Sequence, residues 1–290
     1  MMSVILGQVR RVVLTTAAIL VFFVLAGATY QGAATALERR QFPHPGRLID
    51  VGGHQLHISC IGQGLPTVVL EAPATGMSAA WGWVQPEVAT FTRVCSYDRA
   101  GLGWSEAGDR QYDASGVARE LHTLLQRAEQ AGPYVVAGHG LGAVFAILYA
   151  AQFGPEVAGL VLVDPPARDP TLARNPMMRL VNASPWLART GVLRATRMMS
   201  SNASGLPERS AGALGAFLNR PDHLTRAATE LSRWDEAVAL AAGALIDPSI
   251  TVMRVEAAGR EHAALLTDAG QAAKASDAIR GVVGRVRSRR

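Results

Sequence analysis

Residues 132–165 read GPYVVAGHGLGAVFAILYAAQFGPEVAGLVLVDP, which is three apolar segments separated by short glycine-containing breaks. The first and last segments, Pro133–Gly138 and Gly159–Pro165, are short continuous apolar runs, as is typical of buried parallel strands. The middle segment, residues 141–153, is longer and indicates a helix. A strand, a helix and a second strand in this order form a βαβ unit with a right-handed crossover. The stretch therefore predicts an α/β fold with a mostly parallel sheet flanked by helices.

The same alternation continues on both sides of this unit. A Gly52-Gly53 turn between two β-type runs predicts a hairpin ahead of the parallel strands. Further strands are expected at Leu48–Val51, Gln55–Ile61, Pro66–Ala72, Arg93–Asp98 and Ser249–Gly259. Further helices are expected at residues 81–91, 114–130 and 268–286. From about residue 166 to residue 247 the strand patterns stop and short helical stretches with Pro and Gly breaks follow, which predicts a helical cap inserted over the sheet.

An apolar segment, residues 12–30, precedes the predicted domain. At about 1.5 Å per residue it nearly spans a hydrocarbon core of about 30 Å, so it can cross a bilayer. The chain is then divided into a cytoplasmic n-region (1–11), a transmembrane anchor (12–30), a connector (31–45) and one domain (46–290). A cleaved signal peptide is the alternative, because Ala26-Gly27-Ala28 resembles a cleavage site. The apolar run continues past that site, which favours the anchor.

The orientation of the chain follows from its first arginines. Arg10 and Arg11 lie on the short N-terminal side of the apolar segment, and such residues stay in the cytoplasm. We therefore expect the domain to be extracytoplasmic, either held at the membrane or secreted after cleavage of the segment.

Composition and charge exclude several classes of protein. With 49% hydrophobic and 18% charged residues the chain has ample material for a core. The net charge of +5 comes largely from arginines near the termini, without a basic stripe and interleaved aromatics, so we expect no nucleic-acid partner. Only two cysteines occur, Cys60 and Cys95, which excludes metal clusters built on thiolates. We expect neither a metal nor a cofactor.

Two separated stretches carry a family resemblance. They are VGGHQLHISCIGQGLPTVVLEA with FTRVCSYDRAGLGWSE (residues 51–72 and 91–106), and the βαβ unit of residues 132–165. In this combination the chain resembles the α/β-hydrolase superfamily, and within it serine esterases or peptidases of the N-terminally anchored bacterial kind. The resemblance covers about residues 46–165 well and the C-terminal third loosely. It implies a hydrolase that acts on an ester-like or amide-like small molecule.

The sequence departs from that family at the nucleophile. The family places G-x-S-x-G at a sharp strand-to-helix turn, with the serine oxygen exposed to substrate. Here the turn is Gly138-His139-Gly140-Leu141-Gly142, so Gly140 stands at the nucleophile position and supplies no oxygen. The resemblance also implies an oxyanion hole built from the backbone N–H groups of Leu141 and Ala74, although Pro73 stiffens the second loop.

The resemblance also points to a base and an acid. His262, after the last predicted strand, is the candidate general base, and Asp164, at the end of the strand before the cap, is the candidate acid. If residues 249–259 are instead the penultimate strand, Glu261 takes the acid position and the histidine loop is missing. A surface histidine and a loop-capping aspartate are the structural alternatives for these two residues. Asp98-Arg99 is interpreted as a structural turn.

Two more inferences depend on neighbouring segments. In the strand order usual for this fold the strands carrying Cys60 and Cys95 are neighbours, so we expect a disulfide between them. Gly138, Gly140 and Ala143 also satisfy the G-x-G-x-x-[GA] pattern of dinucleotide-binding turns, with Asp164 ending the next strand. That alternative is disfavoured because such a turn usually opens its domain, whereas several predicted strands precede this one.

The function therefore stays divided between two classes. One is a weak hydrolase whose nucleophile is an activated water, served by His262 or His139. The other is a degenerate member, a pseudoenzyme that acts as a binding or scaffold protein at the membrane. The cap carries no recognisable specificity pattern, so the sequence does not identify the substrate.

Overall fold

The computed structural model describes residues 2–108, 112–167, 175–257 and 262–289. Its centre is a seven-stranded sheet in the order β1-β2-β4-β3-β5-β6-β7. The strands are β1 (Arg47–Asp50), β2 (Gln55–Ile61), β3 (Thr67–Glu71), β4 (Val94–Tyr97), β5 (Tyr134–His139), β6 (Val157–Val163) and β7 (Thr251–Val255). The five strands β4, β3, β5, β6 and β7 are parallel to their neighbours, and β1 and β2 form an antiparallel edge. The predicted parallel sheet and N-terminal hairpin are confirmed.

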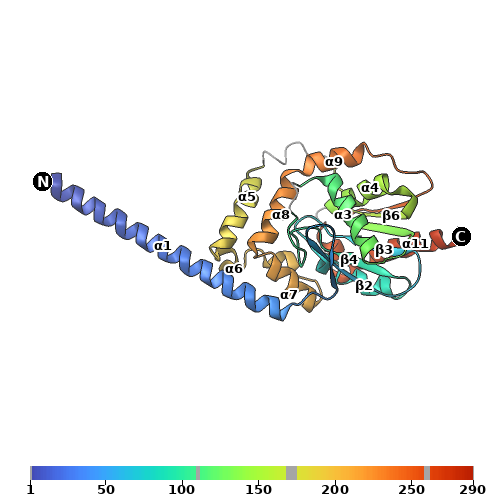
Figure 1. Ribbon diagram of the computed structural model, residues 1–290, viewed down its shortest axis with the longest axis horizontal. Coiled ribbons are helices and arrows are strands. Elements are labelled where there is room, and N and C mark those ends of the chain that lie inside the picture. Colours follow the sequence, from blue (N-terminus) through green and yellow to red (C-terminus); the bar gives the residue numbers. More distant parts are fainter. Residues whose placement is uncertain (1, 109–111, 168–174, 258–261, 290) are drawn as a thin grey trace.

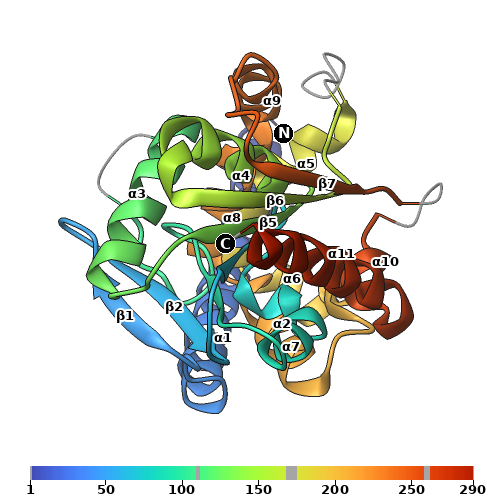
Figure 2. The same cartoon turned by 90° about the vertical axis from the view of Figure 1, so that its right-hand side faces the viewer.

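Helices cover both faces of the sheet (Figure 2). One face is covered by α3 (Ala114–Arg127), α4 (Leu141–Gln152) and α9 (Trp234–Ala242). The other face is covered by α2 (Val84–Ala89), α10 (Ala264–Thr267) and α11 (Ala269–Ser288). Each layer buries an apolar cluster against strands whose side chains are buried on both faces, which is why the strands read as continuous apolar runs.

The segment between β6 and β7 is helical where the structure describes it, as predicted for the cap. Its helices are α5 (Pro176–Arg189), α6 (Val192–Thr196), α7 (Glu208–Phe217), α8 (Pro221–Ser232) and α9. Short 3₁₀ turns lie at Ser78–Trp81, Gly154–Glu156 and Ser200–Ala203. In Figure 1 the helices α5 to α8 lie between the sheet and the long helix α1 (Met2–Gln41). Part of the cap therefore lies between the core and the N-terminal helix.

Two helix predictions differ from the structure. The connector expected at residues 31–45 is helical to Gln41, because its Ala, Leu, Glu and Arg residues favour a helix and Gln31 is buried against the cap. The helix expected at residues 81–91 shortens to α2, and a 3₁₀ turn, Ser78–Trp81, precedes it.

Cys60 and Cys95 face each other across the antiparallel pair β2 and β4. The structure joins them by a disulfide, with a Cα–Cα distance of 4.0 Å. The bond ties the antiparallel edge to the parallel part of the sheet.

Candidate functional site

A sharp turn joins β5 to α4 at Gly140, whose φ is 55° and ψ is −121°. The flanking glycines leave no room for side chains. A Cβ at Gly138 would lie 2.2 Å from the Gly142 carbonyl oxygen, and a Cβ at Gly142 would lie 2.5 Å from the Glu71 carbonyl oxygen. The G-x-G-x-G spacing therefore lets α4 begin directly against the ends of β5 and β3.

Asp164 and His262 form a hydrogen-bonded pair beside this turn. Asp164 directly follows β6 and His262 follows β7, and the distance from His262 Nδ1 to Asp164 Oδ2 is 2.5 Å. The other carboxylate oxygen of Asp164 accepts a hydrogen bond of 3.1 Å from the Ala257 N–H. Partial burial raises the pKa of Asp164, but the hydrogen bonds from His262 and Ala257 outweigh it and the net shift is downward. The aspartate is therefore a charged partner that holds the imidazole in one orientation.

The free nitrogen of His262 faces Gly140. A Cβ built on Gly140 would lie 3.1 Å from His262 Nε2 and 3.0 Å from Cε1. Since Nδ1 is bound to Asp164, Nε2 is the nitrogen available to accept a proton. The structure thus brings together Asp164, His262 and Gly140, the three residues that the sequence nominated from separate segments. Glu261, the alternative acid, lies outside the described residues, and within those residues no strand follows β7.

His139 lies under the imidazole of His262. The two rings are stacked with a centroid distance of 4.3 Å, and His139 Nε2 donates a 3.0 Å hydrogen bond to the His262 carbonyl oxygen. Burial, with a smaller contribution from the neighbouring His262, lowers the pKa of His139 to about 3. His139 is therefore a neutral support for His262, and its Nε2 is occupied by the carbonyl.

The depressed pKa of His139 predicts that acid destabilises the fold. The unfolded chain takes up a proton on this histidine near pH 6.5, whereas the folded chain takes it up only near pH 3. Stability is thus present above pH 6.5 and is lost below it by about 1.4 kcal/mol per pH unit. Glutamine at this position does not titrate, and its amide can still donate to the His262 carbonyl. When the pH falls from 6.5 to 5, we therefore expect the free energy of unfolding of His139→Gln to fall by about 2 kcal/mol less than that of wild type. Urea unfolding in detergent at both pH values measures this, and equal losses would contradict it.

The two backbone N–H groups that the sequence nominated for an oxyanion hole, those of Leu141 and Ala74, belong to the start of α4 and to the loop after β3. Leu141 is the first residue of α4, so its N–H has no acceptor one turn earlier in the helix. Ala74 lies in the loop after β3, and the carbonyls on both sides of it are held. Arg99 donates to the Ala72 and Pro73 carbonyl oxygens at 2.7 and 3.1 Å. On the other side, His223 Nε2 donates to the Thr75 carbonyl oxygen at 2.9 Å.

The Arg99 guanidinium lies at the centre of a buried charge cluster. It contacts Glu71 at 3.2 Å and Glu230 of α8 at 2.8 Å, and all three side chains are buried. The Tyr97 hydroxyl donates to Glu71 as well. Burial raises the pKa of Glu71 to about 7, although Arg99 opposes the rise. The cluster links the cap helix α8 to the loop that carries Ala74.

This cluster is the part of the site that sequence reasoning missed. Asp98 does support a turn, because it accepts hydrogen bonds from the Ser78 and Trp104 N–H groups and from His57. Arg99, however, reaches out of that turn to the cap. Its partner Glu230 lies in a segment without any recognisable motif, so no pattern in the sequence marked it.

The dinucleotide alternative has little support at this turn. Asp164, which would bind the ribose in that alternative, is hydrogen-bonded instead to the Ala257 N–H and to His262, one through each carboxylate oxygen. Within the described ranges, no group of three or more His, Cys, Asp or Glu side chains could hold a metal ion.

Comparison with known proteins adds the family. The model described as "Alpha/beta hydrolase family" matches residues 64–284. An N-formylmaleamate deformylase of Pseudomonas putida strain KT2440 is 33% identical over 104 residues, which is 36% of this chain and 38% of that protein. This chain spans less than half the length of the curated relatives that it matches.

Solved structures share the fold at low identity. An esterase from Thermogutta terrifontis is 20% identical, with a TM-score of 0.58 over 80% of this chain and 94% of that one. The Cif epoxide hydrolase from Acinetobacter nosocomialis is 15% identical, with a TM-score of 0.65 over 86% of this chain and 95% of that one.

Proposed function

This chain belongs to the alpha/beta hydrolase family, and from that premise we propose that it hydrolyses an ester-like or amide-like small molecule with water as the nucleophile. The observation that carries the proposal is the Asp164–His262 pair, whose free nitrogen faces the position of a side chain at Gly140. A general base in this place can act on a water as it would act on a serine hydroxyl.

The proposed step needs no covalent intermediate. His262 Nε2 takes a proton from water while the water oxygen forms a bond to the carbonyl carbon. The carbonyl π electrons move to its oxygen, which the N–H groups of Leu141 and Ala74 stabilise. When the intermediate collapses, the bond to the leaving oxygen or nitrogen breaks and Nε2 returns the proton to it. Asp164 stabilises the imidazolium in between.

We expect such an enzyme to be slow. Enzymes of this type that lose their triad keep about 10³–10⁴-fold acceleration over water from the oxyanion hole and binding alone. A water activated by one general base adds to that residual acceleration, because general-base catalysis contributes typically about 10²–10⁴-fold.

A second candidate is a ligand-binding protein without turnover. It is favoured by Gly140, which offers no oxygen, and by Pro73, which removes one N–H from the loop beside Ala74. In that case His262 and Asp164 would contribute a polar wall to a binding site.

We also propose that α1 anchors the protein in a membrane with the domain on the extracytoplasmic side. By length and composition α1 can cross a bilayer. It continues as a helix through Ala26-Gly27-Ala28, and a Cβ on Gly27 would lie 2.1 Å from the Thr190 carbonyl oxygen of the cap. This close packing favours an intact anchor over a cleaved signal peptide, and an extracytoplasmic compartment is compatible with the disulfide.

A comparison of wild type with His262→Ala tests the proposed chemistry. We expect wild type to hydrolyse short-chain nitrophenyl esters slowly and without a burst, and His262→Ala to lose about 10²-fold of that rate. The control is His122→Ala. His122 lies on α3 and is hydrogen-bonded to Glu156, not to any residue of the proposed site, so this variant should leave the rate unchanged. Turnover that is unaffected by His262→Ala would refute the proposal. Ester binding without turnover would support the second candidate.

A further inference from the structure

The C-terminal part of α1 is bound to the cap by specific contacts. Gln31 Nε2 donates to the Asn219 carbonyl oxygen at 2.7 Å, and Arg194 Nε donates to Gln31 Oε1 at 2.9 Å. Arg194 also forms an ion pair with Glu38. These contacts fix the position of the cap along α1. Gln31 lies one helical turn after Gly27, which packs against the Thr190 carbonyl of the cap.

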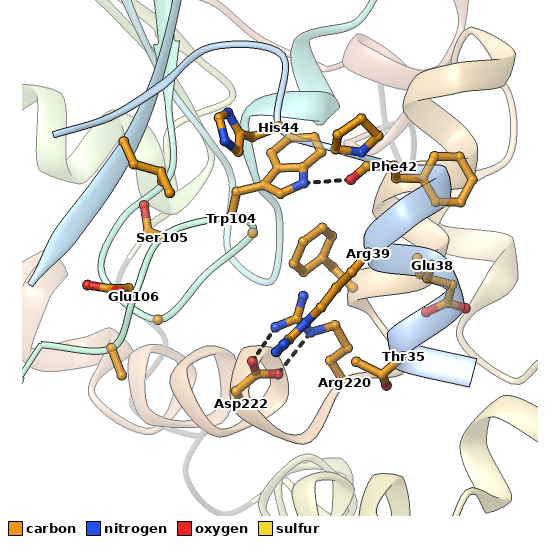
Figure 3. Close-up of a pocket in the computed structure, with 17 residues that line it drawn as sticks. Thr35, Glu38, Arg39, Phe42, His44, Trp104, Ser105, Glu106, Arg220 and Asp222 are labelled. Carbon is orange, nitrogen blue, oxygen red and sulfur yellow. Dashed lines mark hydrogen bonds and ion pairs between the residues drawn. The ribbon is translucent and has the colours of Figure 1, made fainter. Parts of the chain in front are cut away.

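Two adjoining hollows run along this junction. The outer one, of about 950 Å³, begins at Ala28 and follows α1 to Arg40. The inner one, of about 560 Å³, lies between the end of α1, Trp104 and Phe217 (Figure 3). Both are lined by Thr35, Arg39, Arg220 and Asp222, so they form one continuous groove. None of the residues of the Gly140 site lines it.

The outer hollow is strongly basic. Four arginines, Arg39, Arg40, Arg189 and Arg220, line it together with a single carboxylate, Asp222. Arg220 is paired with Asp222 at 2.5 Å, and Figure 3, which draws the inner hollow, shows Arg39 and Arg220 side by side next to Asp222. Within the described residues Arg39, Arg40 and Arg189 form no ion pair. The groove therefore has cationic groups free to receive an anion.

The same hollow has an apolar floor that leads into the membrane segment. Ala28, Gly32 and Ala36 lie one helical turn apart on α1 and leave space above the backbone, and a Cβ on Gly32 would meet no atom within 4 Å. Ala28 belongs to the apolar run that enters the bilayer in the proposed arrangement. From Ala28 to Arg39 is about 16 Å along the helix axis, so a molecule that contacts both ends of this hollow joins the end of the apolar run to the aqueous side of it.

We propose that this groove binds an anionic phospholipid. The inference rests on the proposed role of α1 as a membrane anchor. The phosphate headgroup lies among Arg39, Arg40 and Arg189, where arginine can bind phosphate oxygens in a bidentate manner. An acyl chain follows the Ala28, Gly32 and Ala36 side of α1 into the bilayer, and the inner hollow receives the remainder of the headgroup.

Binding of a fluorescent phosphatidylglycerol to the full chain in non-ionic detergent micelles tests the proposal. We expect Arg39→Gln with Arg189→Gln to weaken binding by about tenfold or more. The matched control is Arg179→Gln with Arg209→Gln, which removes the same charge from cap helices outside the groove and should change binding by less than about twofold. Equal weakening by both pairs would overturn the proposal, because net charge alone would then explain the binding.

A second variant tests the acyl-chain path without removing charge. Gly32→Phe places a ring in open space on a helix, so we expect an unchanged fold and a loss of lipid binding of about tenfold. Phosphatidylcholine should bind weakly and millimolar inorganic phosphate should compete poorly. Strong binding of phosphatidylcholine, or complete displacement by free phosphate, would contradict a lipid site.

The lipid assay is independent of the proposed chemistry. Lipid binding that persists in His262→Ala would separate the two sites. An intact mass that includes residues 1–30 shows that the anchor is present in the sample. A failure of lipid binding in such a sample counts against the groove alone, whereas a missing N-terminal segment counts against the anchor.

Discussion

Gly140→Ser is expected to raise the rate of short-chain ester hydrolysis by about 10²-fold or more over wild type. The new hydroxyl would stand beside His262 Nε2, because a Cβ at this position lies 3.1 Å from that nitrogen. Serine, histidine and aspartate would then form a charge-assisted triad, with the Leu141 N–H at the start of α4. Removal of a triad serine lowers the rate about 10⁶-fold in a well-studied case. A gain of about 10²-fold on introducing the serine here is well within that limit.

The same substitution should lower stability. Gly140 has a φ of 55° and a ψ of −121°, a backbone conformation that costs a non-glycine residue about 1–3 kcal/mol. The His262 ring must also move by a few tenths of an ångström to admit the Cβ. Burst kinetics and the urea unfolding midpoint measure the gain and the cost in one preparation.

Two controls give this experiment its meaning. Gly140→Ala introduces the same Cβ and the same backbone strain without the oxygen, so it should lose stability and gain no activity. Gly140→Ser combined with His262→Ala should return to the low rate. Activity that appears equally in the alanine variant, or that survives loss of His262, would refute the site assignment.

Arg99→Met is expected to destabilise the fold by about 3–5 kcal/mol. Arg99 separates two carboxylates, Glu71 and Glu230, and all three side chains are fully buried. Breaking a buried ion pair by removing one partner leaves uncompensated buried charge, and that accounts for the size of the effect. Urea or thermal unfolding of the full chain in detergent measures the loss.

The matched control is Arg119→Met, which removes an exposed ion pair with Asp113. Exposed pairs contribute about 0–1 kcal/mol, so this variant should stay close to wild type. Adding Glu71→Gln to Arg99→Met should recover part of the loss, because among the described residues Glu71 has its ion pair with Arg99, whereas Glu230 keeps Arg226 at 3.1 Å. A loss of less than 1 kcal/mol in Arg99→Met would show that water reaches the cluster.

The buried cluster also has a consequence for the site. Arg99 holds the Ala72 and Pro73 carbonyls from one side, and His223 holds the Thr75 carbonyl from the other. Both contacts depend on α8, which carries Glu230 and His223. The position of Ala74 is therefore coupled to the cap, and a movement of the cap would change the geometry of the proposed oxyanion site.

The sequence by itself determined the parts of this protein that depend on local pattern. Two apolar runs of strand length on either side of a longer, helical one predicted the βαβ unit. Parallel strands are buried on both faces, so their sequences are continuous apolar runs. Glycines at 138, 140 and 142 indicated a sharp turn, because only glycine admits such close backbone approach. The absence of an oxygen at position 140 also follows from the sequence.

Only the tertiary structure decided what depends on contacts between distant segments. Asp164 and His262 are 98 residues apart, and Arg99 and Glu230 are 131 apart. Asp164 was nominated from its place at a strand end, but Glu230 carried no signal, because a glutamate on an amphipathic helix is usually a solvated residue. The helical connector and the basic groove beside α1 became visible only once the cap was packed against that helix. A local pattern specifies backbone conformation and which face is buried, whereas the partner of a buried charge is chosen by the packing of whole elements.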